Sequence, residues 1–118
     1  KEGNTNNKKV ALLQHGLLDD SYTWLALKEL SLVKLLIEAG YDVWLTNSRG
    51  NVFSTGHIKE DYYDLKSKYW DFTFSDMAKY DLPANIDYIL NYTKKETLIY
   101  IGHSQGTFQF FLNFTLNP

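Results

Sequence analysis

The stretch that decides the fold is Thr97-Leu98-Ile99-Tyr100-Ile101-Gly102-His103-Ser104-Gln105-Gly106-Thr107-Phe108-Gln109-Phe110-Phe111-Leu112. Residues 97–101 are apolar and rich in strand formers, and residues 107–112 are long enough to begin a helix. Between them stands Gly-x-Ser-x-Gly, a weak pattern that a strand–turn–helix context turns into a nucleophile elbow. We therefore predict that Ser104 occupies a strained turn, with its hydroxyl exposed at the carboxyl end of a parallel sheet.

The two glycines of the motif have a steric explanation. Gly102 and Gly106 stand two residues before and after Ser104, where the strand and helix backbones nearly touch and a side chain would clash. The backbone N–H of Gln105, at the start of the predicted helix, is one expected donor to an oxyanion. The pattern predicts acyl transfer through Ser104, and the alternative is a chance match.

Composition limits the classes of protein that fit. The 118 residues allow one domain at most, and 44% hydrophobic residues are enough to build a core. A net charge of −2 argues against a nucleic-acid partner, and a single arginine, Arg49, excludes an arginine cluster for phosphate. Cysteine is absent, so disulfides and Cys-based zinc sites are excluded. We also expect no metal and no cofactor. No apolar run is long enough for a transmembrane helix, and the polar first residues do not form a signal peptide.

Strands and helices alternate along the chain. The predicted strands are residues 10–14, 41–45 and 97–101, and the predicted helices are residues 27–39, residues 82–90 and the segment that follows the elbow. Gly40 is expected to end the first helix, Asp81 to cap the second, and Pro83 to lie in its first turn. Residues 1–9 are expected to be a flexible lead-in, and residues 47–69 to be largely irregular. This order predicts an α/β fold with a parallel sheet and crossover helices.

The loop after the first strand is the expected source of the second oxyanion donor. It reads His15-Gly16-Leu17-Leu18, which is neither a dinucleotide-binding nor a P-loop pattern. We predict that the Leu17 N–H is the donor, that Gly16 lets the backbone pass close to the reacting carbonyl, and that His15 braces the loop. A plain strand-ending turn is the alternative.

A base for Ser104 is not evident. Catalytic serines in this architecture precede their acid and histidine, yet none of the 14 residues after Ser104 is His, Asp or Glu. We expect His103 to pack or form hydrogen bonds beneath the turn and His57 to be exposed, and the alternative is that one of the three histidines is the base. The aspartates before the elbow are interpreted as caps and solvated faces: Asp42, Asp71, Asp76, Asp81 and Asp87. Six aromatic residues could line an acyl pocket or pack in the core: Trp24, Trp44, Tyr69, Trp70, Phe72 and Phe74.

Several longer segments resemble the acid lipases, the gastric, lingual and lysosomal enzymes with related sterol ester hydrolases. The matching segments are 13–18 (LQHGLL), 42–45 (DVWL), 47–51 (NSRGN), 69–72 (YWDF), 77–84 (MAKYDLPA) and 102–107 (GHSQGT). The resemblance implies an α/β-hydrolase fold and hydrolysis of triacylglycerols or cholesteryl esters at a lipid–water interface. It also implies a secreted or lysosomal location, with Ser104 as nucleophile and Leu17 and Gln105 as oxyanion hole.

The resemblance also defines what this segment lacks. Acid lipases are roughly three times longer, so we expect residues 10–118 to form a partial α/β-hydrolase domain without the first strands, the lid, the triad acid and the triad histidine. Such a chain alone is expected to be inactive. Two glycosylation sequons begin at Asn91 and Asn113, and Asn91 matches a family sequon. The alternatives are a non-catalytic module that binds a protein partner and an acyltransferase or thioesterase on the same fold.

Overall fold

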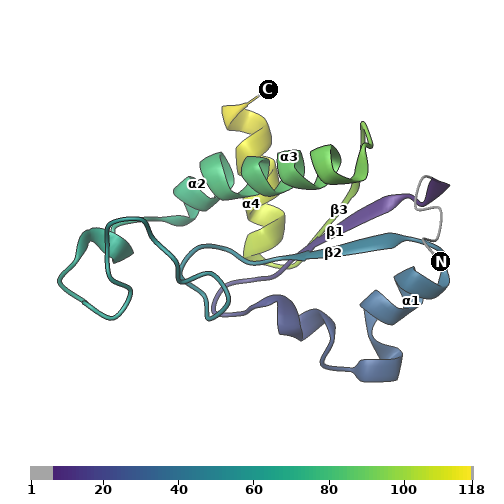
Figure 1. Ribbon diagram of the computed structural model, residues 1–118, viewed down its shortest axis with the longest axis horizontal. Coiled ribbons are helices and arrows are strands. Elements are labelled where there is room, and N and C mark those ends of the chain that lie inside the picture. The colour runs from purple at the N-terminus through teal and green to yellow at the C-terminus, as the bar shows by residue number, and fades with distance from the viewer. Residues whose placement is uncertain (1–6, 118) are drawn as a thin grey trace.

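The computed structural model describes residues 7–117, and its centre is a parallel sheet of three strands (Figure 1). The strands are β1 (Val10–Gln14), β2 (Asp42–Thr46) and β3 (Ile99–Gly102), in the spatial order β2-β1-β3. Leu12 of β1 is paired with Trp44 of β2 and with Tyr100 of β3. The predicted parallel sheet is confirmed. Most of the expected lead-in lies outside the described residues, which include only its last three positions.

The central strand separates two apolar cores. Val10 and Leu12 point to one face, where they pack with Leu82 and Ile89 of a helix. Alternate residues of β1 point to the other face and pack with Val33. All five residues of β1 are buried, as a continuous apolar run predicts for a strand covered on both faces.

Helices cover both faces of the sheet. Helix α1 (Leu32–Glu38) lies on one face, and α2 (Phe74–Asp76), α3 (Leu82–Thr93) and α4 (Gln105–Leu116) lie on the other (Figure 1). The chain also forms short 3₁₀ turns at Ser21–Trp24, Lys28–Leu30 and Lys68–Trp70 and a π-helical turn at Met77–Asp81. No helix within residues 7–117 has the length and apolar character needed to span a membrane.

The first helix is shorter than the predicted residues 27–39. Lys28 has φ +47°, which no right-handed helix can contain, so a continuous helix cannot pass through it. A short 3₁₀ turn follows at Lys28–Leu30, and α1 begins only after Ser31. Ser31 accepts the Lys34 N–H at 3.2 Å as the N-cap. The predicted end is confirmed: Gly40 has φ +88° and donates to Ile37, which closes the helix in a Schellman motif.

The second helical segment begins earlier than the predicted residue 82. Thr73 starts α2 with a capping box to Asp76, and a π-helical turn at Met77–Asp81 leads directly into α3. The Thr73 N–H donates to the Asp76 carboxylate, and this hydrogen bond lowers the pKa of that group. Pro83 lies in the first turn of α3, as predicted. The proline has no N–H for the preceding turn, which fits the wider hydrogen bonding of the π turn.

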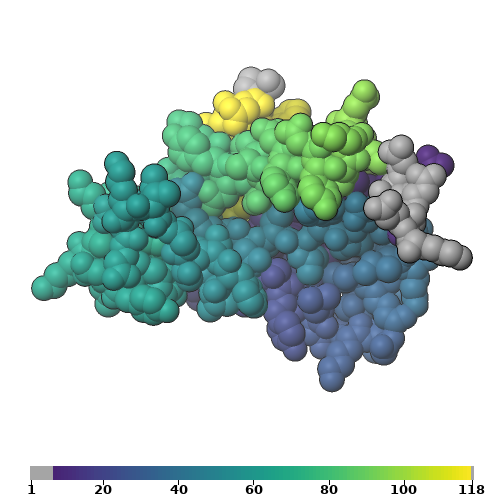
Figure 2. Space-filling model, viewed as in Figure 1, coloured from purple at the N-terminus to yellow at the C-terminus, as the bar shows by residue number. Residues whose placement is uncertain are grey.

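Residues 47–67 are irregular, as predicted, and a 3₁₀ turn at Lys68–Trp70 ends the irregular segment slightly before the predicted residue 69. They run as turns beyond the carboxyl ends of the strands, at the left of Figure 1. In the space-filling view the same teal residues form a lobe at one end of the molecule (Figure 2). This position places the loop after β2 beside the loop after β1, where a site can form.

Replacing Gly40 by alanine tests the left-handed end of α1. A Cβ at Gly40 meets nothing within 4 Å, so the whole effect comes from its φ of +88°. We expect Gly40→Ala to lower the free energy of unfolding by about 1–2 kcal/mol, measured by urea denaturation. Gly56→Ala is the matched control, because its Cβ also meets nothing within 4 Å and its φ is not left-handed. Equal free energies of unfolding for the two variants would contradict a left-handed conformation of Gly40 at the end of α1.

Candidate active site

Ser104 stands at the sharp turn between β3 and α4. Its backbone has φ +51° and ψ −115°, a conformation that favours glycine and strains a residue with a side chain. Ser104 is exposed, and it directly precedes the first residue of α4. The strained backbone expected at this position is therefore present, with the serine at the carboxyl end of the sheet.

Both glycines of the motif lie where backbones meet. A Cβ on Gly102 would lie 2.7 Å from the Thr107 nitrogen. A Cβ on Gly106 would lie 2.6 Å from the Gln14 carbonyl oxygen and 2.8 Å from that of His15. These separations are shorter than real Cβ contacts, so α4 can pack against the sheet in this way only with glycine at both positions.

Two side-chain hydrogen bonds stabilise the same turn. The Tyr100 hydroxyl donates to the Gly106 carbonyl at 2.7 Å, and the Thr107 hydroxyl donates to the Gly102 carbonyl at 2.8 Å. Burial raises the pKa of Tyr100 well above its ordinary value, so this hydroxyl stays protonated and remains a donor. The strained serine is thus held from both sides of the turn.

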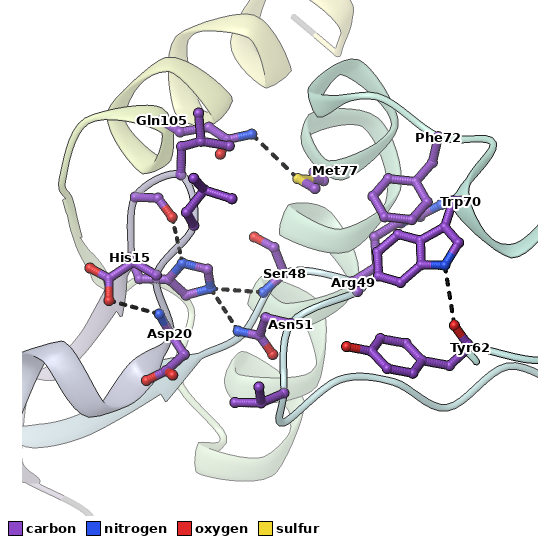
Figure 3. Close-up of a pocket in the computed structure, with 16 residues that line it drawn as sticks. His15, Asp20, Ser48, Arg49, Asn51, Tyr62, Trp70, Phe72, Met77 and Gln105 are labelled. Carbon is purple, nitrogen blue, oxygen red and sulfur yellow. Dashed lines mark hydrogen bonds between the residues drawn. The ribbon is translucent and has the colours of Figure 1, made fainter. Parts of the chain in front are cut away.

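The loop after β1 lies against this turn. A Cβ on Gly16 would be 3.2 Å from Ser104 Cβ, so the two backbones approach closely. The next residue, Leu17, lines a cavity of about 390 Å³. Gln105 lines the same cavity (Figure 3). Gln105 is the first residue of α4, and its N–H therefore has no carbonyl partner inside the helix. The two residues predicted for an oxyanion hole thus line one cavity beside Ser104.

His15 holds the loop in place as a neutral imidazole. Its ring is buried, and Nε2 accepts the Ser48 N–H at 3.0 Å and lies 3.2 Å from Asn51 Nδ2 (Figure 3). A backbone N–H can only donate, so Nε2 carries no proton and Nδ1 does. Nδ1 then donates to the Gly16 carbonyl at 2.8 Å. His15 therefore connects the loop after β1 to the loop after β2.

The bond from His15 also fixes the direction of the Leu17 N–H. The Gly16 carbonyl and the Leu17 N–H belong to one peptide group, which is planar and trans. Holding the carbonyl oxygen on one side points the N–H to the opposite side.

A buried polar network below the site was not predicted. Thr46 donates to Gln14 at 2.8 Å, and both Gln14 and Gln109 donate to the Ser48 hydroxyl, at 3.1 and 3.3 Å. All four side chains are buried. The network joins the ends of β1 and β2 to the first turns of α4. The only sequence signal was a glutamine at the end of an apolar strand and another within an apolar helix.

Asp81 does not cap a helix, so that prediction is wrong. It lies in the last position of the π-helical turn, makes no capping bond, and instead binds Arg49. The Arg49 guanidinium and backbone N–H both donate to the Asp81 carboxylate, which raises the pKa of Arg49 above its ordinary value. A pair separated by 32 positions leaves no local pattern in the sequence.

The aromatic residues divide between the cavity and the cores. Trp70 and Phe72 line the cavity together with Tyr62, and Trp70 Nε1 donates to the Tyr62 carbonyl at 3.2 Å (Figure 3). The other four candidates pack elsewhere: Trp24 and Trp44 against the two cores, Tyr69 among aromatic rings, and Phe74 on Phe108. The packing interpretation is confirmed for Trp24 and Trp44, whereas an acyl pocket lined by Trp70 and Phe72 stays a prediction.

Neither of the remaining histidines forms a hydrogen bond with Ser104 in the described part of the chain. His103 was expected to pack beneath the turn, but its side chain is exposed and lines a different hollow beside Trp24, because the turn directs neighbouring side chains apart. His57 is exposed, as predicted, and its Nδ1 accepts backbone N–H groups at 3.1 and 2.8 Å. Within residues 7–117, no group of three metal-ligating side chains comes together.

The two sequons differ in accessibility. Asn91 is exposed in the last turn of α3. Asn113 is half-buried in α4, and its side-chain nitrogen donates to the Ala78 carbonyl at 2.8 Å. Only Asn91 therefore presents a free amide nitrogen for attachment of a glycan.

Comparison with known proteins places this geometry in a family. Residues 10–114 match the family described as the alpha/beta hydrolase fold. The chain belongs to this family. It is 48% identical to human gastric triacylglycerol lipase over 118 residues and 46% identical to human lipase member K over 117 residues. It is also 48% identical over 113 residues to a protein of Crotalus adamanteus that carries the name lysosomal acid lipase/cholesteryl ester hydrolase.

Within the alpha/beta hydrolases, the resemblance to acid lipases is confirmed across nearly the whole chain. The matches to the two human lipases cover 98% of this chain and 29% of each relative, and the match to the snake protein covers 94% and 28%. The chain thus spans less than a third of the length of these curated relatives. The covered part includes the elbow, the His15 loop and the Arg49–Asp81 pair.

Substitution of His15 by phenylalanine tests whether the hydrogen bonds of His15 hold the loops after β1 and β2 together. The variant keeps an aromatic ring at this position, but the Ser48 N–H and the Gly16 carbonyl lose their buried hydrogen-bond partner. We expect His15→Phe to lower the free energy of unfolding by roughly 2–4 kcal/mol, measured by urea denaturation. His57→Phe is the control and is expected to change stability by less than about 0.5 kcal/mol, because His57 is exposed. If the His15 variant is as stable as the His57 variant, His15 does not stabilise the two loops.

Proposed function

We propose that this chain carries the nucleophile and the oxyanion hole of a serine hydrolase that acts on lipid esters. The observation that supports the proposal is the strained Ser104 packed against Gly16, with Leu17 and Gln105 lining the adjacent cavity. An exposed serine held at a strand–helix turn, beside orphan backbone donors, suits attack on a carbonyl.

The proposed reaction has two halves. Ser104 Oγ attacks the ester carbonyl carbon while a histidine base takes the hydroxyl proton, and the carbonyl oxygen becomes an oxyanion. The N–H groups of Leu17 and Gln105 donate to this oxyanion. The bond to the alcohol then breaks, the histidine returns its proton to the departing oxygen, and an acyl-enzyme remains. Water, deprotonated by the same base, releases the carboxylic acid and restores Ser104.

The base and its acid are proposed to lie in a part of the protein beyond this segment. In this architecture the chain order is serine, acid, histidine. Of the three histidines present, His15 is engaged in the brace, His57 is exposed on the long loop, and His103 lines another hollow. The 118-residue chain alone is therefore proposed to be inactive.

Neutral lipid esters are the proposed substrates. The relatives are named for triacylglycerol and cholesteryl ester hydrolysis. The cavity suits an acyl chain, because Leu17, Trp70 and Phe72 give it apolar walls. The same names support a secreted or lysosomal location, where the exposed Asn91 is the proposed glycan site. No cofactor is required by this chemistry.

Removing the hydroxyl of Ser104 tests the role of the nucleophile. In the complete natural protein, we expect Ser104→Ala to lower kcat on a triacylglycerol emulsion by on the order of 10⁴- to 10⁶-fold. A fluorophosphonate should label the unmodified protein on Ser104, as read by peptide mass spectrometry. Ser75→Ala, at an exposed serine of α2, should leave both activity and labelling unchanged. Labelling at another serine would show that Ser104 is not the nucleophile.

The intact mass of the natural protein tests where the base resides. The segment has a mass of 13.7 kDa and covers 29% of the human gastric lipase chain, so we expect a natural mass about three times larger. Mass spectrometry of the protein from its source measures this directly. A natural mass near 13.7 kDa would favour the alternative of a non-catalytic module bound to a protein partner.

A further inference from the structure

The ion pair of Arg49 and Asp81 lies beside the cavity, and the proposed reaction leaves it without a role. Arg49 Nε donates to Asp81 Oδ1 at 2.8 Å, and Nη2 contacts the same oxygen. The Arg49 backbone N–H donates to Asp81 Oδ2 at 3.1 Å. One carboxylate therefore holds both the side chain and the main chain of Arg49, in a fork geometry that a lysine cannot reproduce.

Aromatic packing restricts the pair further. The guanidinium carbon of Arg49 lies 5.7 Å from the Phe72 ring centre and 5.9 Å from that of Tyr80. The next residue, Gly50, has φ +84°, and a Cβ there would lie 2.8 Å from Phe72 Cζ. The side chains of the pair are only 36% and 16% exposed, so solvent screens them less than a surface pair. The loop after β2 is thus held in one position around Arg49.

The residues on either side of Arg49 are the partners of His15. Ser48 precedes Arg49, and its N–H donates to His15 Nε2 at 3.0 Å. Asn51 follows two residues later, and its Nδ2 lies 3.2 Å from the same nitrogen. The position of Arg49 therefore sets both contacts that keep the proton of His15 on Nδ1, facing the Gly16 carbonyl.

We infer that Arg49 and Asp81 are positioning residues for the oxyanion hole. They hold residues 48–51 so that His15 fixes the peptide group between Gly16 and Leu17, and this peptide group directs the Leu17 N–H to the reacting oxygen. The inference rests on the proposed function, because it assigns that N–H to the oxyanion. Neither side chain of the pair touches the reacting atoms.

Two conservative variants of the complete protein test the inference. Arg49→Lys keeps the charge but loses the planar fork, and Asp81→Asn keeps the shape but loses the charge. A misdirected oxyanion donor weakens binding of the transition state but not of the substrate. We expect kcat per titrated active site to fall about 10- to 100-fold, with KM changed by less than about twofold. Lys34→Gln is the control, because it removes an exposed ion pair to Glu38 on α1.

A second measurement requires no turnover. The imidazole ¹⁵N shifts of His15 should report a single Nδ1-protonated tautomer in the unmodified protein. In either variant of the pair they should report a mixture of tautomers, and in Lys34→Gln they should not change. Because the lysine variant keeps the positive charge, it decides the question if Asp81→Asn fails to fold.

The outcomes separate this inference from the proposed function. A fall in kcat together with a tautomer mixture supports the positioning role. An unchanged kcat, an effect confined to KM, or an unchanged His15 tautomer overturns it. If Ser104→Ala abolishes turnover while the variants of the pair keep full kcat, only the positioning role fails. If Ser104→Ala retains activity, the proposed function itself fails.

Discussion

The backbone of Gly106 lies so close to the end of β1 that the remaining geometry of the site follows from this contact. A Cβ there would stand 2.6 Å from the Gln14 carbonyl oxygen, so helix and strand touch with nothing between them. Helix α4 begins immediately after the turn, and only His103 and Ser104 separate it from the end of β3. The second of these residues, Ser104, has a positive φ of +51°, and this strained conformation lets the chain turn sharply from the strand into the helix.

Around this contact, the carboxyl ends of the strands carry polar groups that are buried and paired. Thr46, Gln14, Ser48 and Gln109 form one hydrogen-bonded set, and His15 joins the two loops above it. A buried polar group without a partner destabilises the fold, so each member restricts where the others can lie. The apolar cores on the two faces hold the sheet together, whereas these polar contacts determine the shape of the edge formed by the carboxyl ends of the strands.

Local sequence patterns predicted the parts of the molecule that local physics determines. The strands follow from apolar runs, the end of α1 from Gly40, and the elbow from a steric requirement for glycine. The predicted start of the first helix was wrong because nothing in the sequence marks the positive φ of Lys28. The partnership of Arg49 with Asp81 depends on how two distant segments meet in space, and a pattern read along one chain does not contain that information.

The strain at Ser104 also bears on the history of the chain. A glycine at this position would adopt the same backbone without penalty, whereas a serine gives up about 1–3 kcal/mol of stability to hold it. A domain kept only as a scaffold has no reason to retain such a residue, since random substitution would relax the turn at no loss to its packing. The strained conformation of Ser104 therefore supports its proposed role as nucleophile over the alternative of a non-catalytic binding module.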